Sequence, residues 1–532
     1  MVKIDLKYRY GFNWYHKEGI YAKGYLFDAA NALYQDEELT SYFSSVSDYH
    51  SFREKVSQAN GMFSVIIVKD DLILMGTDII RAFPLFYHHD SQCLHISDNA
   101  QFLADTYSKE VNTTRSIEYL ATGFTTGKHT LFTDIYQLQP GQIISLREGT
   151  AAESEFYFSY ATGNTHEMAY DELKLRMKDI LNRVFDRLIR SAGNRQIVVP
   201  LSGGYDSRLI AAMMKNKGVK DVICITYGKK DAPEKSISKK VAAQLGYQWL
   251  FTEHTPEIVN HYFESEEFAG YYPYAANGVG FSYLFEYFGA SSLKHKYGLP
   301  EDSLFIPGHS GDFLGGSQIT KFGIPMSGSL RSAMNRLYRL KFNYIVPKHK
   351  DSLLFKKDIQ EYLSPLFNEY GNQFSYSYIE DWDYREKLAK TIANSSNVFS
   401  YFGFQYRLPY WDREIVEFFR WVPFPYKLKK KLYNEVLEEY FFKPQGLCFE
   451  DEMKASVFTY RLQQVKARLK PVIPYFIKKR SNLKVDWADY HLITAPMVKQ
   501  LKDSAIDFRI YDVPFNSIIM QWYLAKLKHQ IP

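Results

Sequence analysis

The residues best suited to chemistry lie in one short segment, Val198–Arg208 (VVPLSGGYDSR). An apolar strand is expected to run into a Ser-Gly-Gly turn, and a helix should follow directly. Gly203 and Gly204 let the backbone approach a ligand closely, and the start of a helix offers free N–H groups and the positive end of its dipole. With the hydroxyl groups of Ser202 and Ser207, the segment predicts a binding site for phosphate or pyrophosphate.

Asp206 lies in the same segment, at the expected start of the helix. A carboxylate repels phosphate unless it holds Mg²⁺ or lies close to it, so Asp206 also indicates a metal site. The alternative is a tight turn in which Asp206 and Ser207 only cap the helix. The segment is neither a Walker A loop, since no GKS or GKT follows, nor a GxGxxG turn.

Alternating strands and helices surround this turn and must position it. Strands are predicted over residues 196–200, 221–228 and 247–254, and helices over residues 207–218 and 234–246, both closed by a glycine. The order β-α-β-α-β is typical of a doubly wound parallel sheet. The fold class is therefore α/β in this part of the chain.

The first part of the chain, to about residue 160, has a different pattern. Short apolar or β-branched runs at residues 62–68, 72–76, 94–97 and 138–146 are broken by turn residues, which predicts strands. A polar linker at 162–167 should lead into an amphipathic helix at about 170–191, and the chain from 256 onward is predicted to be mostly helical.

The composition narrows the class of protein. The chain has 532 residues, 46% hydrophobic residues and a net charge of +5 with a pI of 8.6, which does not indicate a dedicated nucleic-acid binder. Cys93, Cys224 and Cys448 are far apart and predict neither a disulfide scaffold nor a zinc module. Without a signal-peptide pattern or an apolar run of membrane-spanning length, we expect a soluble, cytoplasmic protein with no membrane span.

The SGGYDS turn resembles the pyrophosphate loop of the ATP-pyrophosphatase superfamily, whose members cleave ATP between the α- and β-phosphates and transfer AMP to an oxygen. Residues 226–248, 305–317 (FIPGHSGDFLGGS), 402–419 (FGFQYRLPYWDREIVEFF) and 428–437 resemble, in order, motifs of asparagine synthetase-like ligases. The resemblance runs from about 170 to 440. It implies a doubly wound ATP-pyrophosphatase domain with a helical C-terminal extension over residues 170–532.

The same resemblance implies roles for individual residues and the cofactors ATP and Mg²⁺. ATP and pyrophosphate would be bound by Ser202, Gly203, Gly204, Asp206, Ser207, Ser310 and Gly311, adenosine by Val199, Leu201 and Thr226, and Mg²⁺ by Asp206 and Asp312. Helix capping is the alternative role for Asp312.

Residues 61–87 resemble the core of a class II glutamine amidotransferase domain, with Asp78 and Arg81 at matching places. This implies an N-terminal αββα sandwich of the Ntn-hydrolase type over residues 1–165. The nucleophile of that family is a cysteine exposed by removal of Met1, whereas Val2 follows Met1 here, and Cys93 is expected in the core. We therefore expect a degenerate domain that does not hydrolyse glutamine.

The implied reaction is ATP-dependent amide formation, in which an adenylated carboxylate is attacked by an amine. Aspartate is the default acid by resemblance, and a uronic or other sugar acid is the alternative. The amine would be free ammonia, an amino acid or amino sugar, or ammonia from a partner. By resemblance the catalytic residues would be Asp206, Gln405 and Arg407, and Arg407 would bind an anion, with a structural ion pair as the alternative. Relatives place a glutamate before the Arg-x-Pro motif, where this chain has Gln405. Gln405 cannot accept a proton, so either another group acts as the base, or the amine arrives deprotonated, or the acyl-transfer step is impaired.

The sequence leaves open the phosphate-binding lysine, the alternative functions and the oligomeric state. Lys443 and Lys454 are candidates for a phosphate-binding lysine, whereas residues 429–431 resemble a solvated basic helix face. RNA thiolation would need catalytic cysteines and a basic face, which are not evident. An ATP-binding pseudoenzyme or scaffold without chemistry is the main alternative, and a homodimer is compatible with the sequence.

Overall fold

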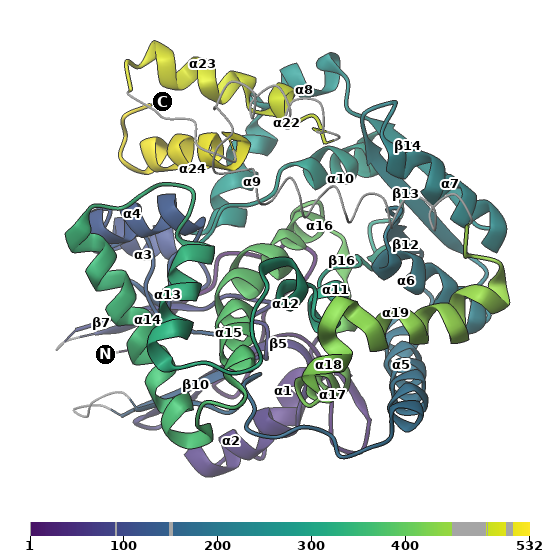
Figure 1. Cartoon of the computed structure of the whole chain (residues 1–532). Coiled ribbons are helices and arrows are strands. Elements are labelled where there is room, and N and C mark those ends of the chain that lie inside the picture. The colour runs from purple at the N-terminus through teal and green to yellow at the C-terminus, as the bar shows by residue number, and fades with distance from the viewer. Residues whose placement is uncertain are drawn as a thin grey trace.

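The chain forms two stacked sheets in its first 156 residues and one parallel sheet in the part that follows (Figure 1). The computed structural model describes residues 2–90, 93–147, 153–449, 486, 488–506 and 514–531. In Figure 1 the purple and blue strands of the first part lie at the lower left, and the teal strands of the parallel sheet lie at the right.

Two sheets make up the N-terminal sandwich. The smaller has the order β1-β8-β7-β9, and the larger has the order β11-β10-β6-β5-β3-β2 with β4 paired to β3. The strands are β1 (Val2–Asp5), β2 (Tyr15–Lys17), β3 (Ile20–Phe27), β4 (Leu33–Gln35), β5 (Asn60–Lys69), β6 (Leu72–Thr77), β7 (Phe86–His89), β8 (Leu94–Ser97), β9 (Tyr136–Gln137), β10 (Gln142–Arg147) and β11 (Glu153–Phe156).

Strand β5 shows why the sandwich has four layers. Phe63 and Val65 point to one face, where they pack with α1 (Glu38–Phe43) and α2 (Tyr49–Gln58). Ile66 points to the other face and packs between the two sheets with Ile96 of β8. This alternation follows from the two-residue period of a strand. Helices α3 (Ala100–Thr106) and α4 (Thr113–Thr122) complete the predicted αββα order, with α3 packed on β7.

The second sheet system is fully parallel and has the order β14-β13-β12-β15-β16. Its strands are β12 (Ile197–Pro200), β13 (Val222–Gly228), β14 (Gln248–Glu253), β15 (Leu304–Phe305) and β16 (Gln405–Tyr406). The predicted β-α-β-α-β unit is confirmed, with α6 (Tyr205–Asn216) and α7 (Pro233–Leu245) as its helices. The chain winds outward from β12 in both directions, so the loops after β12 and β15 diverge at a topological switch point, where such sheets bind ligands.

Most of the remaining described chain is helical, as predicted. The long helix α5 (Tyr170–Ala192) buries its apolar stripe in the core and contacts α6, α17 and α19. The others are α8 (Pro256–Tyr262), α9 (Glu266–Ala276), α10 (Phe285–His295), α11 (Gly311–Leu314), α12 (Ser317–Phe322), α13 (Leu330–Lys341), α14 (His349–Tyr370), α15 (Ser375–Asp383), η1 (Tyr384–Ala393), α16 (Asn397–Tyr401), η2 (Pro409–Trp411), α17 (Arg413–Arg420), α18 (Phe424–Lys427), η3 (Leu428–Lys430), α19 (Lys431–Leu437), η4 (Glu438–Phe442), η5 (Lys443–Gln445), α22 (Tyr490–Ile493), α23 (Ala495–Asp503) and α24 (Pro514–Leu527). None of the helices within the described ranges has both the length and the apolar character that crossing a membrane requires.

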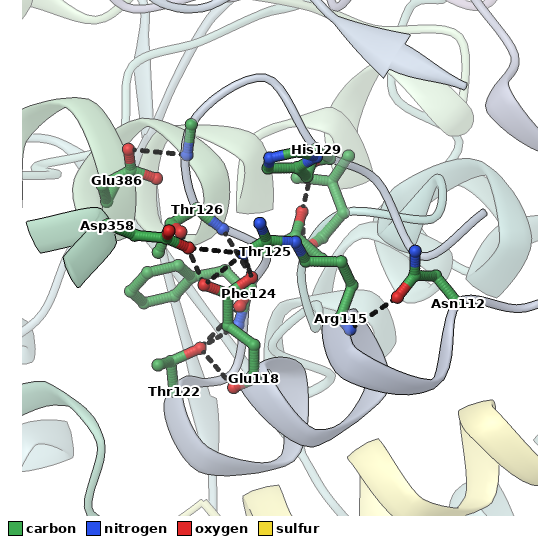
Figure 2. A network of polar contacts seen from close by, with 12 residues as sticks. Asn112, Arg115, Glu118, Thr122, Phe124, Thr125, Thr126, His129, Asp358 and Glu386 are labelled. Atoms are coloured by element: carbon green, nitrogen blue, oxygen red, sulfur yellow. Dashed lines mark hydrogen bonds and ion pairs between the residues drawn. The ribbon is translucent and has the colours of Figure 1, made fainter. Parts of the chain in front are cut away.

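A buried polar network joins the two halves (Figure 2). Arg115 of α4 donates to both carboxylate oxygens of Glu118 at 3.1–3.2 Å and to Asp358 of α14 at 3.1 Å. In the loop that follows, the N–H of Gly127 donates to Glu386 at 3.0 Å, and Lys390 donates to the carbonyl of Gly127 at 2.9 Å. The loop between α4 and β9 is therefore held by side chains from the second half of the chain.

We expect Arg115→Met to lower the free energy of unfolding by about 3–5 kcal/mol, because it leaves the buried Glu118 carboxylate without its cation. Arg53→Met is the matched control, since its partner Glu155 is 36% exposed and such pairs contribute less than about 1 kcal/mol. Urea unfolding followed by circular dichroism measures both variants. Glu118→Gln added to Arg115→Met should restore part of the loss, and equal effects of Arg115→Met and Arg53→Met would contradict the assignment.

Candidate active site

A cavity of about 320 Å³ lies at the switch point of the parallel sheet. Its wall combines the loop after β12, the end of β13, the start of α10 and the loop after β15. The lining residues are Pro200, Ser202, Gly204, Tyr205, Asp206, Ser207, Tyr227, Phe285, Glu286, Pro307, Gly308, His309, Asp312 and Lys430. The predicted phosphate loop therefore faces a space that has room for a ligand.

The phosphate loop is organised by its own hydroxyl groups. The N–H of Ser202 donates to Oγ of Ser207 at 3.0 Å, and the N–H of Gly204 donates to Oγ of Ser202 at 3.1 Å. Gly204 directly precedes α6, and no side chain in the described structure caps this helix. The N–H groups of the first turn of α6 are thus left for an anion, as the sequence predicts.

Asp206 connects the two loops at the switch point. Its Oδ2 accepts from the N–H of Asp312 at 2.8 Å, and its Oδ1 accepts from the hydroxyl of Tyr433 at 2.8 Å. The hydroxyl of Tyr410 donates to its backbone carbonyl at 2.6 Å. Burial raises the pKa of Asp206 to about 7, and the nearby charge of Asp312 acts in the same direction.

The two carboxylates fit a magnesium site. Asp206 lies in the first turn of α6 and Asp312 in the first turn of α11, and both face one cavity, where their repulsion would be relieved by a divalent cation. The described residues contain no group of three or more His, Cys, Asp or Glu side chains placed to hold a metal. Mg²⁺ commonly takes one or two carboxylates from a protein and completes its coordination with phosphate oxygens and water.

Two other predicted phosphate residues lie in the loop after β15. Ser310 has a positive φ of 75°, and its buried Oγ has no hydrogen-bond partner among the described residues. A Cβ at Gly311 would stand 2.5 Å from the hydroxyl oxygen of Tyr433 and 2.8 Å from Cγ of Asp206. The absence of a side chain at Gly311 thus lets the loop approach Asp206.

The predicted adenosine residues lie beneath the wall of the cavity. Val199, Leu201 and Thr226 are buried at the ends of β12 and β13. The hydroxyl of Thr226 donates to the carbonyl of Leu201 at 2.8 Å, so it ties the two strand ends together. Their neighbours Pro200 and Tyr227 line the cavity instead.

Gln405 and Arg407, predicted as catalytic, do not line this cavity. The Oε1 of Gln405 accepts from both terminal nitrogens of Arg407 at 3.3 Å. Arg407 is buried beside the N-terminal sandwich, where its guanidinium lies 3.9 Å from the ring centre of Tyr25 and donates to Oγ of Ser191 at 3.1 Å. Burial lowers the pKa of Arg407 to about 10. The structure therefore places this pair at the junction of the two halves.

Lys430 is a cavity residue that the sequence interpretation missed. It lines the cavity, and its charge acts to lower the pKa of Asp206. The interpretation of residues 429–431 as a solvated helix face is thus wrong for Lys430. Lys429 and Lys430 both have a φ of 56°, so the chain turns sharply before α19. Lys443 does not line the cavity, and Lys454 is outside the described residues.

Tyr410, Tyr433, Glu286 and His309 were also missed as site residues. The two tyrosines lie in motifs that the resemblance includes, but a tyrosine gives no signal by itself. Glu286 belongs to a helix with no motif. His309 lies within residues 305–317, directly before Ser310. This position is the one feature of the sequence that indicates His309 as a site residue.

In the N-terminal half, Asp78 has a structural role. Its carboxylate accepts from the N–H groups of Phe63, Ile80 and Ala82, and it fixes the turn after β6. Burial raises the pKa of Asp78 to about 7. Cys93 is only partly buried and precedes β8, with its Sγ 3.4 Å from the hydroxyl of Tyr107. The expectation that Cys93 is a core residue is therefore wrong.

Two family models match parts of the chain: "Glutamine amidotransferase domain" matches residues 48–157, and "Asparagine synthase" matches residues 180–274. Within these two ranges the chain resembles an asparagine synthase with an N-terminal glutamine amidotransferase domain. The two matches fall on the N-terminal sandwich and on the start of the parallel sheet, and they confirm the resemblance drawn from the motifs.

Individual relatives are distant. The chain is 23% identical over 298 residues to the microcin J25-processing protein McjC of Escherichia coli; the match covers 54% of this chain and spans about half (53%) of that relative. Among solved structures, an NH3-dependent NAD synthetase from Campylobacter jejuni has 16% identity and a TM-score of 0.21, covering 41% of this chain and 94% of that one. The U34-tRNA thiolase NcsA from Methanococcus maripaludis has 13% identity and a TM-score of 0.20, covering 42% and 80%.

Proposed function

We propose that the protein is an ATP-dependent ligase that joins a carboxylate and an amine as an amide, forming AMP and pyrophosphate. The observation that carries this proposal is the meeting of Asp206, Asp312 and Lys430 with the uncapped start of α6 in one cavity. A helix start and a lysine bind phosphates, and a pair of carboxylates binds the accompanying Mg²⁺. The asparagine synthetase-like character of the chain supports the amide-forming step.

The proposed roles follow from these positions. The first-turn N–H groups of α6, the hydroxyls of Ser202 and Ser207, and Lys430 bind the phosphates of ATP. Asp206 and Asp312 hold Mg²⁺, which when bound supplies neutralisation of the phosphate charge. The substrate carboxylate attacks the α-phosphate, the bond to pyrophosphate breaks, and the amine then displaces AMP. Tyr410 and Tyr433 fix the position of Asp206 throughout.

The substrates are proposed at the level of class. Aspartate follows from the resemblance to asparagine synthetases, and a sugar acid is the second small acid. One relative is named for processing microcin J25. A carboxyl group of a substrate of that kind is therefore a third candidate. We propose that the amine comes from outside the N-terminal half, residues 1–165, and that residues 170–532 carry the chemistry.

The test is exchange of radiolabelled pyrophosphate into ATP in the presence of Mg²⁺ and each candidate acid. Exchange that depends on one acid supports adenylation and identifies the substrate. Absence of exchange with every acid, together with ATP binding, would favour the alternative of an ATP-binding scaffold. At the level of the sequence, that alternative is favoured by Gln405, which stands where relatives have a glutamate and cannot accept a proton.

The raised pKa of Asp206 predicts a pH dependence of Mg²⁺ binding. Below pH 7 the carboxyl is mostly protonated and attracts a cation less, so we expect the Mg²⁺ concentration for half-maximal exchange to rise by up to about tenfold per pH unit, and to be nearly constant above pH 8. Tyr433→Phe separates this effect from protonation of ATP. Tyr433→Phe removes a donor that lowers the pKa of Asp206, so the midpoint of the pH dependence of the Mg²⁺ requirement should move to higher pH. An unchanged midpoint would show that the profile belongs to ATP.

A further inference from the structure

The wall of the cavity also carries a chain of polar side chains outside the phosphate loop. Glu286 lies in the first turn of α10, and its Oε1 is 3.2 Å from Nε2 of His309. The Nδ1 of His309 is 3.0 Å from Oγ of Ser396, which is fully buried between η1 and α16. Three segments far apart in the sequence thus converge on one carboxylate at the cavity.

This carboxylate is only half satisfied. Glu286 is 5% exposed, and its Oε2 has no hydrogen-bond partner among the described residues. Leaving a buried acceptor without a donor costs about 1–3 kcal/mol, and more for a charged group. Such a position is stable in a working protein when a ligand supplies the missing donor.

The surroundings of Glu286 favour a cationic donor. Tyr227 and Phe285 line the same cavity, so a carboxylate and two aromatic rings border one space. Burial raises the pKa of Tyr227, and the charge of Glu286 adds to the shift, which places the two groups near each other. Carboxylates and aromatic faces both attract ammonium groups, and the attraction grows where water is excluded.

We propose that Glu286 binds the amine substrate as its ammonium ion and takes a proton from it. This inference rests on the proposed ligase function and specifies its second substrate as a primary amine or ammonia that arrives as a cation. An ammonium has no lone pair, so a base is required before it can attack. Gln405 cannot serve, whereas Glu286 lines the cavity that holds the phosphate loop, and its buried Oε2 has no hydrogen-bond partner among the described residues.

The proton balance is complete without another reactant. One proton passes from the ammonium to Oε2 of Glu286, and the nitrogen lone pair then forms the C–N bond with the adenylated carbonyl carbon. The C–O bond to AMP breaks, its electron pair stays on the AMP phosphate, and the second N–H proton leaves with that phosphate. Glu286 returns its proton to solvent before the next turnover.

His309 and Ser396 are positioning residues in this scheme. With the hydroxyl of Ser396 donating to Nδ1, the ring proton of His309 is on Nε2 and donates to Oε1 of Glu286. This contact holds Oε1 and leaves Oε2 as the oxygen without a partner among the described residues.

Glu286→Gln tests the proposal, because glutamine keeps the shape but neither attracts a cation nor accepts a proton. With the acid that supports exchange, we expect pyrophosphate exchange to stay within about threefold of wild type, while amide formation from ammonium chloride falls by about 10²–10⁴. Hydroxylamine is largely uncharged at neutral pH and should still trap the acyl group as a hydroxamate. Glu301→Gln, at an exposed glutamate, is the matched control and should change none of these rates.

A second measurement does not depend on knowing the acid. Binding of methylammonium chloride, followed by saturation-transfer NMR against methanol as the uncharged probe, should be seen in wild type and Glu286→Asp and lost in Glu286→Gln. His309→Gln should lower only amide formation, by about tenfold. It replaces Glu286→Gln as the test variant if Glu286→Gln does not fold.

The outcomes separate the inference from the proposed function. Amide formation or methylammonium binding by Glu286→Gln at the wild-type level would overturn the inference. Loss of exchange in that variant, with methylammonium still bound, would overturn it too and assign Glu286 to adenylation. Wild-type protein that shows no exchange with any acid would contradict the ligase, and methylammonium binding would still decide whether Glu286 forms a cation site.

Discussion

Asp206→Asn is expected to lower the rate of acid-dependent ATP–pyrophosphate exchange by about 10³-fold, equivalent to about 4 kcal/mol of transition-state stabilisation. The substitution removes one of the two carboxylate charges that face the cavity. It also removes one acceptor, because asparagine cannot accept from both Tyr433 and the N–H of Asp312. Exchange rates at saturating ATP and Mg²⁺ measure the effect.

Asp221→Asn is the matched control, since Asp221 is exposed and lies at the opposite end of the parallel sheet, directly before β13. It should leave exchange unchanged. If Asp206 acts only as a structural residue of the turn, Asp206→Asn should lower the melting temperature and the exchange rate together. A loss of exchange with an unchanged melting temperature supports a role in binding the metal and the phosphates, and an unchanged exchange rate would contradict it.

The parts of the fold that could be predicted from sequence are those set by short-range patterns. The strand 197–200, the Ser-Gly-Gly turn and α6 follow from residues within about fifteen positions of one another, and the structure agrees with the prediction to within two or three residues. The four-layer sandwich was predictable through the motif resemblance and the strand pattern of β5 and β6. In both cases local periodicity and burial point to the same structure.

The missed site residues depend on long-range contacts or unusual backbone. Glu286, His309 and Ser396 meet only because α10, the loop after β15 and the end of η1 pack together, and no spacing in the sequence encodes that meeting. Lys430 reaches the cavity through two consecutive left-handed lysines, although nothing in a run of lysines predicts such backbone angles.

Gln405 and Arg407 are residues that the motif indicates as site residues but that do not line the cavity. They were assigned to the site because their motif aligns with one that carries a base in relatives. In this chain Arg407 extends toward Tyr25 and Ser191, and Gln405 accepts from it. The direction of these side chains depends on the packing between the two halves of the chain, which motif position does not encode.

Gly308→Ala is expected to lower kcat/KM for exchange by about 10²-fold without altering any charged group, because misplacement by about 1 Å has effects of this size. A Cβ at position 308 would stand 2.7 Å from the backbone nitrogen of Ser207, a contact that only a shift of main chain relieves. The first turn of α6 and the loop after β15 would then move apart, and Asp206 would separate from the N–H of Asp312.

Gly328→Ala provides the comparison for Gly308→Ala, because the nearest atom to its Cβ is Oγ of Ser375 at 3.6 Å. We expect no change in exchange for that variant. ATP binding should weaken less than exchange in Gly308→Ala, since the helix start remains intact while its distance from Asp312 changes. Equal losses of binding and exchange would mean that the phosphate loop works alone. A selective loss of exchange would mean that adenylation requires the loops after β12 and β15 in contact, which is the physical reason for a site at the switch point of this sheet.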